Sequence, residues 1–158
     1  MTNEQFTQAV NAHMDTVYRV ALQYCRDPAA AEDVSQEVFL RLYKTKTEFQ
    51  DENHLKFWLI RVAVNESKRA LTSPWRRAES LEGQAEPPAL SDAEDREIYS
   101  LVMDLPRKYR VVIYLYYYEG YATGEIARLL HLPAATVRTQ LDRGRKLLKE
   151  RLLEAEHV

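Results

Sequence analysis

The sequence predicts an all-α fold made of two small helical domains joined by a flexible linker. Apolar residues recur at helical spacing along most of the chain. Residues that favour helices are abundant, whereas the 158 residues include only 4 glycines. The helical pattern breaks once, between residues 73 and 92. These observations divide the chain into an N-terminal domain at 1–72, a linker at 73–92 and a C-terminal domain at 93–158.

Seven helices are expected, and local signals mark some of their ends. In "RDPAAAEDV", Asp27 can cap a helix and Pro28 suits its first position. The segment "YRVVIYLYYY", residues 109–118, is rich in β-branched and aromatic residues that also favour strands. The chain offers it no partner strand, so we expect a helix with mostly buried faces, and we interpret its tyrosines and Trp58 as core residues. The expected ranges are 4–24, 29–44, 53–72, 93–103, 107–118, 123–130 and 133–151.

The linker is predicted from "SPWRRAESLEGQAEPPALSD", which holds three prolines, one glycine and no sustained period. Four acidic residues outnumber two arginines there, so the segment carries net negative charge. The acidic residues are Glu79, Glu82, Glu86 and Asp92, and the arginines are Arg76 and Arg77.

Composition argues against several classes of protein. The single cysteine, Cys25, allows no disulfide within the chain and indicates a reducing compartment. The 4 histidines are scattered, and we find no metal-ligand spacing, glycine-rich phosphate loop or nucleophile–histidine pair. We therefore expect no enzyme, no cofactor and no metal. Because no long apolar run or N-terminal signal is present, we expect a cytoplasmic protein without membrane insertion.

A basic helix-turn-helix is predicted near the C-terminus, although the chain has a net charge of −2. The segment "HLPAATVRTQLDRGRKLLKERL", residues 131–152, places Val137, Leu141, Gly144 and Leu148 on one helix face and basic residues opposite. A short amphipathic segment, "TGEIARLL", precedes it. Such a helix enters the major groove while Arg and Lys neutralise phosphates, although a solvated charged helix is the alternative. Gly144 indicates close packing, because glycine costs about 1 kcal/mol in a helix.

Three segments, taken in order, resemble bacterial sigma factors of RNA polymerase. "LPRKYRVVIYLYYYEGYATGEIARLLHLPAATVRTQLDRGRKLLKERL", residues 105–152, is similar to their promoter-binding C-terminal domain, region 4. "AAAEDVSQEVFLRLYK", residues 29–44, resembles the polymerase-binding helix of region 2, and "KFWLIRVAVNESKR", residues 56–69, resembles the segment that follows it. Their order and spacing match the small extracytoplasmic-function (ECF) group. The resemblance implies a region 2 helical bundle and a region 4 helix-turn-helix.

The resemblance implies a promoter-specificity subunit that binds core RNA polymerase and promoter DNA. Region 2 would dock on the polymerase and help open the minus-ten element, and region 4 would read the minus-thirty-five element. In the family, the linker runs toward the active-site cleft and RNA exit path, and an anti-sigma factor is a usual partner. Two other classes stay open: a free-standing helix-turn-helix regulator that dimerises, and a helical adaptor that binds only protein.

The resemblance also assigns roles to three sets of residues. Asp33 and Glu37 share a helix face with Gln36, and the matching positions bind arginines on the coiled-coil clamp helices of the polymerase largest subunit. The minus-ten contacts would come from Arg61, Asn65, Lys68 and Arg69. The minus-thirty-five contacts would come from Arg138, Thr139, Arg143, Arg145 and Lys146.

Some positions depart from the family pattern or stay undecided. Gln140 stands where a basic residue is common, and because it lies beside the apolar stripe its role in base recognition stays open. Ala122 replaces a hydroxyl residue, so it cannot complete a capping box with Glu125, and we expect Thr123 to cap instead. The loop at residues 44–54 matches the family's site for a flipped base, but we expect its Phe49 to anchor the loop to the core.

Overall fold

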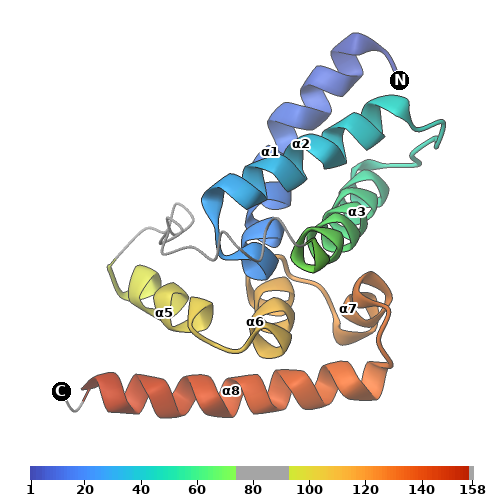
Figure 1. Ribbon diagram of the computed structural model, residues 1–158. Coiled ribbons are helices and arrows are strands. Elements are labelled where there is room, and N and C mark those ends of the chain that lie inside the picture. Colours follow the sequence, from blue (N-terminus) through green and yellow to red (C-terminus); the bar gives the residue numbers. More distant parts are fainter. Residues whose placement is uncertain (74–92, 157–158) are drawn as a thin grey trace. The chain divides into compact units, whose positions relative to one another are not determined.

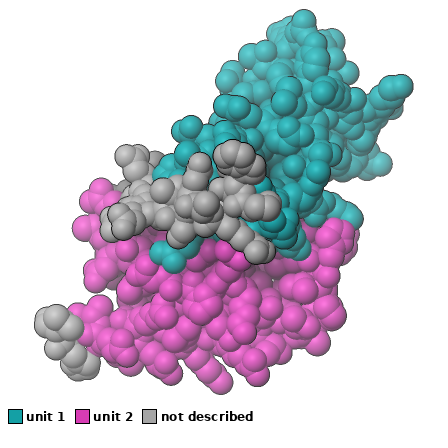
Figure 2. Space-filling view, viewed as in Figure 1, with its two compact units in different colours: residues 1–85 teal, residues 86–158 magenta. Residues whose placement is uncertain are grey.

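The computed structural model describes residues 1–73 and 93–156, which contain helices and turns but no strand (Figure 1). The chain forms two units, residues 1–85 and 86–158, which have different colours in Figure 2. The predicted all-α fold with two small helical domains is confirmed. The linker predicted at 73–92 lies, apart from residue 73, outside the described residues.

The first unit is a bundle of three helices that each pack on the other two: α1 (Asn3–Cys25), α2 (Pro28–Lys44) and α3 (Glu52–Thr72). The helical spacing of apolar residues gives each helix one buried face. These faces supply Val17, Val20 and Leu22 from α1, Val34, Val38 and Leu42 from α2, and Leu59, Ile60 and Val64 from α3. Each buried side chain of this size stabilises the fold by about 1.5–3 kcal/mol, so packing holds the helices together.

Each helix of this unit begins at a side-chain cap. The hydroxyl of Thr2 accepts a hydrogen bond from the Gln5 amide, and the Gln5 side chain accepts one from the Thr2 amide, which makes a full capping box. The Asp27 carboxylate accepts hydrogen bonds from the amides of Ala29 and Ala30, with Pro28 at the first helical position, as predicted. The Asp51 carboxylate caps α3 in the same way.

The second unit contains α5 (Ala93–Met103), α6 (Arg107–Ile113), η1 (Tyr114–Tyr118), α7 (Thr123–Leu130) and α8 (Ala134–Glu156). The long helix α8 packs against α5, α6 and α7. The core of the unit includes Tyr99, Leu105, Ile113, Leu115, Ile126, Leu129, Val137 and Leu141. The helices α7 and α8 therefore pack on each other and contribute to one core.

The segment "YRVVIYLYYY" is helical, as predicted, but its last five residues form a turn of π-helix, η1. Tyr114 is buried, and its hydroxyl donates a 2.7 Å hydrogen bond to the Glu119 carboxylate. The interpretation of all these tyrosines as core residues is wrong for Tyr117, whose exposed fraction is 54%. A π-turn adds a residue to the helical repeat, so the side chains beyond it leave the face that a 3.6-residue period predicts.

Gly144 lies where α8 crosses α6, and the close packing expected there is confirmed. A β-carbon added to Gly144 would stand 2.8 Å from Cδ1 of Ile113 and 3.2 Å from Cβ of Tyr109. Glycine therefore lets the two helices approach more closely than alanine would allow.

The predicted helix bounds agree with the observed bounds to within one residue, except at the end of α8, which continues to Glu156. The expectation that Thr123 caps α7 is wrong. Thr123 is the first helical residue and Ala122 is the N-cap. Half of a capping box nevertheless forms, because the Glu125 carboxylate accepts a 3.0 Å hydrogen bond from the Ala122 amide.

Candidate functional site

The exposed side of α2 carries the three predicted polymerase-binding residues. Asp33 and Gln36 are exposed, and Glu37 is about half exposed. The next residue after each of the two carboxylates is buried, namely Val34 after Asp33 and Val38 after Glu37. The polar face of the helix therefore points outward. The three side chains therefore share one surface, as their spacing predicted.

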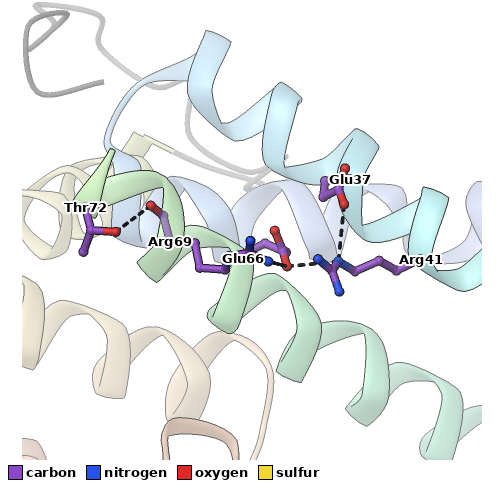
Figure 3. A network of polar contacts seen from close by, with 5 residues as sticks. All are labelled: Glu37, Arg41, Glu66, Arg69 and Thr72. Carbon is purple, nitrogen blue, oxygen red and sulfur yellow. Dashed lines mark hydrogen bonds and ion pairs between the residues drawn. The ribbon is translucent and has the colours of Figure 1, made fainter. Parts of the chain in front are cut away.

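Glu37 belongs to a chain of ion pairs that connects α2 to α3 (Figure 3). Nε of Arg41 lies 3.4 Å from Oε1 of Glu37 and 3.0 Å from Oε1 of Glu66. The same Glu66 oxygen lies 3.3 Å from a guanidinium nitrogen of Arg69. The Glu66 side chain is 12% exposed, so one largely buried carboxylate is shared by two arginines.

A shallow hollow of about 400 Å³ follows this ion-pair chain along the surface. Asp33, Glu37, Arg41, Glu66 and Arg69 line it. The hollow brings Asp33 and Glu37 of α2, which are predicted to bind polymerase, beside a predicted DNA-binding residue of α3. Arg41 and Glu66 were not predicted from the sequence. A signal was present, because opposite charges four residues apart (Glu37 and Arg41) and three residues apart (Glu66 and Arg69) can pair on one helix face.

The predicted minus-ten residues all lie on the exposed side of α3. Arg61, Asn65, Lys68 and Arg69 are exposed, and the opposite side of the helix is buried by residues that include Leu59, Ala63 and Ser67. The structure thus places the four side chains on one surface. Arg69 also forms the ion pair with Glu66.

The loop before α3 is anchored by an aromatic cluster, as we expected for Phe49. The Phe49 ring makes edge contacts with His54 at 5.2 Å and with Trp58 at 5.5 Å between ring centroids. Such pairs typically contribute about 0.5–1.5 kcal/mol beyond buried area. Phe49 therefore attaches residues 45–51 to the first turns of α3.

The second unit contains the predicted helix-turn-helix. The helix α7 ends at Leu130, and its C-cap residue, His131, adopts a left-handed backbone conformation with φ of 56°. The helix α8 starts three residues later, and Val137 and Leu141 bury its inner face. Arg138, Thr139, Arg143 and Lys146 are exposed on its outer face.

Arg145 is placed differently from the other predicted DNA-binding residues of α8. Its Nε donates a 2.6 Å hydrogen bond to the Tyr117 hydroxyl, and its guanidinium lies over the rings of Tyr116 and Tyr117. It also lies 3.4 Å from the Asp142 carboxylate. The hydrogen bond to Tyr117 raises the pKa of Arg145 above its ordinary value. Within residues 93–156, we find no ion pair for Arg138, Arg143 or Lys146.

Gln140 faces the packed side of α8, as its place beside the apolar stripe suggested. Its amide oxygen is buried and finds no hydrogen-bond donor in the described part of the chain. Gln140 is therefore only partly exposed, unlike Arg138 and Thr139.

The described residues contain neither a candidate metal site nor a membrane-spanning helix. No group of three or more His, Cys, Asp or Glu side chains there could hold a metal ion. No helix in residues 1–73 or 93–156 is long and apolar enough to cross a bilayer.

The comparison with protein families identifies both units. Residues 9–77 match sigma-70 region 2, and residues 95–148 match sigma-70 region 4. Together with the helix-turn-helix and the three-helix bundle, these matches define a sigma factor, the promoter-specificity subunit of RNA polymerase. The chain belongs to the ECF group of this family, as the following relatives show.

The chain is similar to curated sigma factors over almost all its length. It is 28% identical to the ECF sigma factor SigW of Bacillus subtilis over 94% of the chain and 89% of that protein. It is 26% identical to the sigma-H factor of Pseudomonas aeruginosa over 93% of the chain and 86% of that protein. It is also 30% identical to the "Probable RNA polymerase sigma factor RfaY" of Xanthomonas campestris over 96% of the chain, but spans 41% of that protein's length.

Solved structures share the fold. The sigma factor RpoE of Bartonella quintana, in complex with the anti-sigma factor NepR, matches with a TM-score of 0.75 at 18% identity. That match covers 94% of this chain and 97% of RpoE. CnrH, in complex with the cytosolic domain of CnrY, matches with a TM-score of 0.65 at 22% identity over 98% of this chain and 90% of its own.

Proposed function

We propose that this sigma factor docks on core RNA polymerase through the exposed face of α2. The observation that carries the proposal is the surface formed by Asp33, Gln36 and Glu37, at the positions that bind polymerase arginines in the family. Carboxylate–guanidinium pairs are strong and directional. Glu37 is already paired with Arg41 at 3.4 Å, so docking replaces an internal arginine by an external one. Glu66, at 3.0 Å from Arg41, keeps that arginine compensated during the exchange.

The exposed side of α3 contacts the minus-ten element in this proposal. Arg61, Lys68 and Arg69 track phosphates of the separated strand, and Asn65 hydrogen-bonds a base edge. The four side chains are exposed on one surface of a helix whose other side is core, which supports a shared ligand.

The helix α8 reads the minus-thirty-five element in the major groove. Arg138 and Thr139, which are exposed in its first turns, contact base edges, and Arg143 and Lys146 contact phosphates. Arg145 reaches the backbone from its position over Tyr116 and Tyr117, where the rings orient its guanidinium. Arg138, Arg143 and Lys146 are exposed and have no ion pair within residues 93–156, which supports the assignment.

The remaining parts of the proposal follow from this role. The chain acts in the cytoplasm, performs no covalent chemistry of its own, and needs no cofactor. An anti-sigma factor regulates it. Two solved structures support this, since RpoE is bound to the anti-sigma factor NepR and CnrH is bound to the cytosolic domain of CnrY.

Docking is tested by gel filtration of the full chain with core RNA polymerase. We expect the wild-type chain to elute with polymerase and the Asp33→Arg/Glu37→Arg variant to elute alone. The matched control is Asp15→Arg/Glu48→Arg, which makes the same charge change at two exposed acidic residues outside α2. Circular dichroism checks that both variants keep their helices. Co-elution of the α2 variant at the wild-type level would contradict the docking assignment.

The rival function is a free-standing helix-turn-helix regulator. It predicts that the wild-type chain elutes apart from polymerase, at the volume of a dimer, and still retards duplex DNA. That result would overturn the assignment of α2 to polymerase.

A further inference from the structure

A second surface hollow lies on the C-terminal unit, between the start of α6 and the first turns of α8. Its volume is about 280 Å³. Lys108 and Tyr109 of α6 form one side, and Thr136, Thr139, Gln140 and Arg143 of α8 form the other. Two of these residues, Thr139 and Arg143, belong to the predicted minus-thirty-five surface, so the hollow continues that surface onto a helix outside the helix-turn-helix.

The residues that line the hollow have the chemistry of an anion site. Lys108 and Arg143 are exposed cations, and Thr136 and Thr139 add two hydroxyl donors. No carboxylate lines the hollow. Within the described part of this unit, neither Lys108 nor Arg143 has an acidic partner. Two uncompensated cations beside hydroxyl groups suit a phosphate, which accepts several charge-assisted hydrogen bonds.

Two features of the lining bear on how the hollow can bind an anion. The Lys108 ammonium lies 5.1 Å from the centroid of the Tyr109 ring, which limits the positions of a long side chain at the edge of the hollow. Gln140 has a buried amide oxygen without a donor. A buried unpaired amide is costly, and if the side chain reorients, its NH₂ group can donate to a phosphate oxygen.

We infer that this hollow binds one phosphate of the promoter backbone, and that Lys108 is a DNA-contacting residue outside the helix-turn-helix. The inference rests on the proposed function, because it places DNA on the outer face of α8. A phosphate held between α6 and α8 fixes the register of α8 in the groove without reading sequence. Lys108 therefore contributes to affinity for all duplexes alike.

The salt dependence of binding gives the expected size of this contribution. Each phosphate neutralised by a cation contributes about 0.9 to the slope of log K against log salt. Loss of one contact therefore lowers affinity roughly eightfold at about 0.1 M salt and makes the slope shallower by about 0.9. A merely structural role for Lys108 would not change this slope.

The experiment measures fluorescence anisotropy of a mixed-sequence, 30-base-pair duplex with the full chain at about 50–200 mM KCl. The variants are Lys108→Ala and Lys108→Arg, with Arg96→Ala as the control, because Arg96 is an exposed cation on α5 that does not line the hollow. We expect the roughly eightfold loss and the shallower slope for Lys108→Ala alone. Lys108→Arg should restore wild-type binding.

A variant of the main DNA surface separates the two hypotheses. If Arg138→Glu weakens binding while Lys108→Ala binds with the wild-type affinity and slope, the hollow is no phosphate site and the proposed function survives. If Arg138→Glu also leaves binding unchanged, or the wild-type chain does not bind the duplex, both the inference and the minus-thirty-five assignment are wrong.

Discussion

Replacement of Gly144 by alanine tests the packing of α8 on α6. Alanine favours a helix over glycine by about 1 kcal/mol, so propensity alone predicts a more stable variant. The new β-carbon, however, would stand 2.8 Å from Cδ1 of Ile113 and 3.2 Å from Cβ of Tyr109. Ile113 is only 1% exposed, and Cβ of Tyr109 is fixed to the backbone of α6, so neither contact is relieved without moving the core.

The magnitude follows from these opposing terms. Overpacking of this kind costs about 1–3 kcal/mol, which outweighs the gain in propensity and leaves a net loss of about 1 kcal/mol. For a domain of this size, such a loss lowers the melting temperature by about 4–8 °C. Gly124→Ala is the matched control, because a β-carbon on Gly124 of α7 would have nothing within 4 Å. We expect Gly124→Ala to be neutral or stabilising.

Hydrogen exchange measured by mass spectrometry assigns the effect to the C-terminal unit. Amides of α8 should exchange faster in Gly144→Ala than in the wild type, whereas amides of α2 should be unchanged. If Gly144→Ala and Gly124→Ala both slow exchange and raise the melting temperature, helix propensity decides the outcome. The close-packing argument for Gly144 would then be wrong.

Three further perturbations have defined outcomes. Asp27→Ala removes the cap of α2 and should lower the free energy of unfolding by about 1 kcal/mol. Asp27→Asn should keep most of that stability, because asparagine can also cap a helix. If urea titration shows that both variants lose the same free energy of unfolding, the capping role of Asp27 is refuted. Glu66→Gln leaves Arg41 and Arg69 without their shared carboxylate. It should destabilise the N-terminal unit by about 0.5–1 kcal/mol, which hydrogen exchange would detect as faster exchange of α3 amides. If the stability of the variant and of the wild type is independent of salt concentration, the ion pairs of Glu66 do not stabilise the unit. Burial first, then the charges of Glu119 and Glu125, raises the pKa of Tyr121 to about 12 from 10.0. The stability that its neutral phenol contributes is complete below pH 10 and lost as pH rises toward 12. Tyr121→Phe should therefore lose less stability than the wild type over that interval in thermal melts, and identical losses would contradict the burial argument.

The sequence predicted the helices well because their signals are local. The cap at Asp27 and the apolar faces of α2 and α3 depend on residues one to four positions apart, which periodicity detects. The exposure of Asp33, Gln36 and Arg138 follows from the same spacing. The break at residue 73 also needs no tertiary information.

Contacts between residues that are far apart in the sequence could not be predicted. Arg41 and Glu66 meet only because α2 packs on α3, and Tyr117 meets Arg145 only because η1 turns its side chain away from the core. A helical wheel assigns Tyr117 to the inner face, since it assumes a constant 3.6-residue repeat that the π-turn breaks. Lys108 stayed unnoticed for a similar reason, because the α8 side chains beside it come from a distant segment.

The central claim is that the chain directs RNA polymerase to particular promoters, and mapping of transcript 5′ ends tests it most directly. Core polymerase would transcribe fragmented genomic DNA of the same organism with the wild-type chain, with the Arg138→Glu variant, and without either. We expect the wild-type chain to add a discrete set of start sites that share two sequence elements at a fixed spacing, and the variant to lose them. If the wild-type chain adds no start sites to those of core polymerase, it does not act as a promoter-specificity subunit.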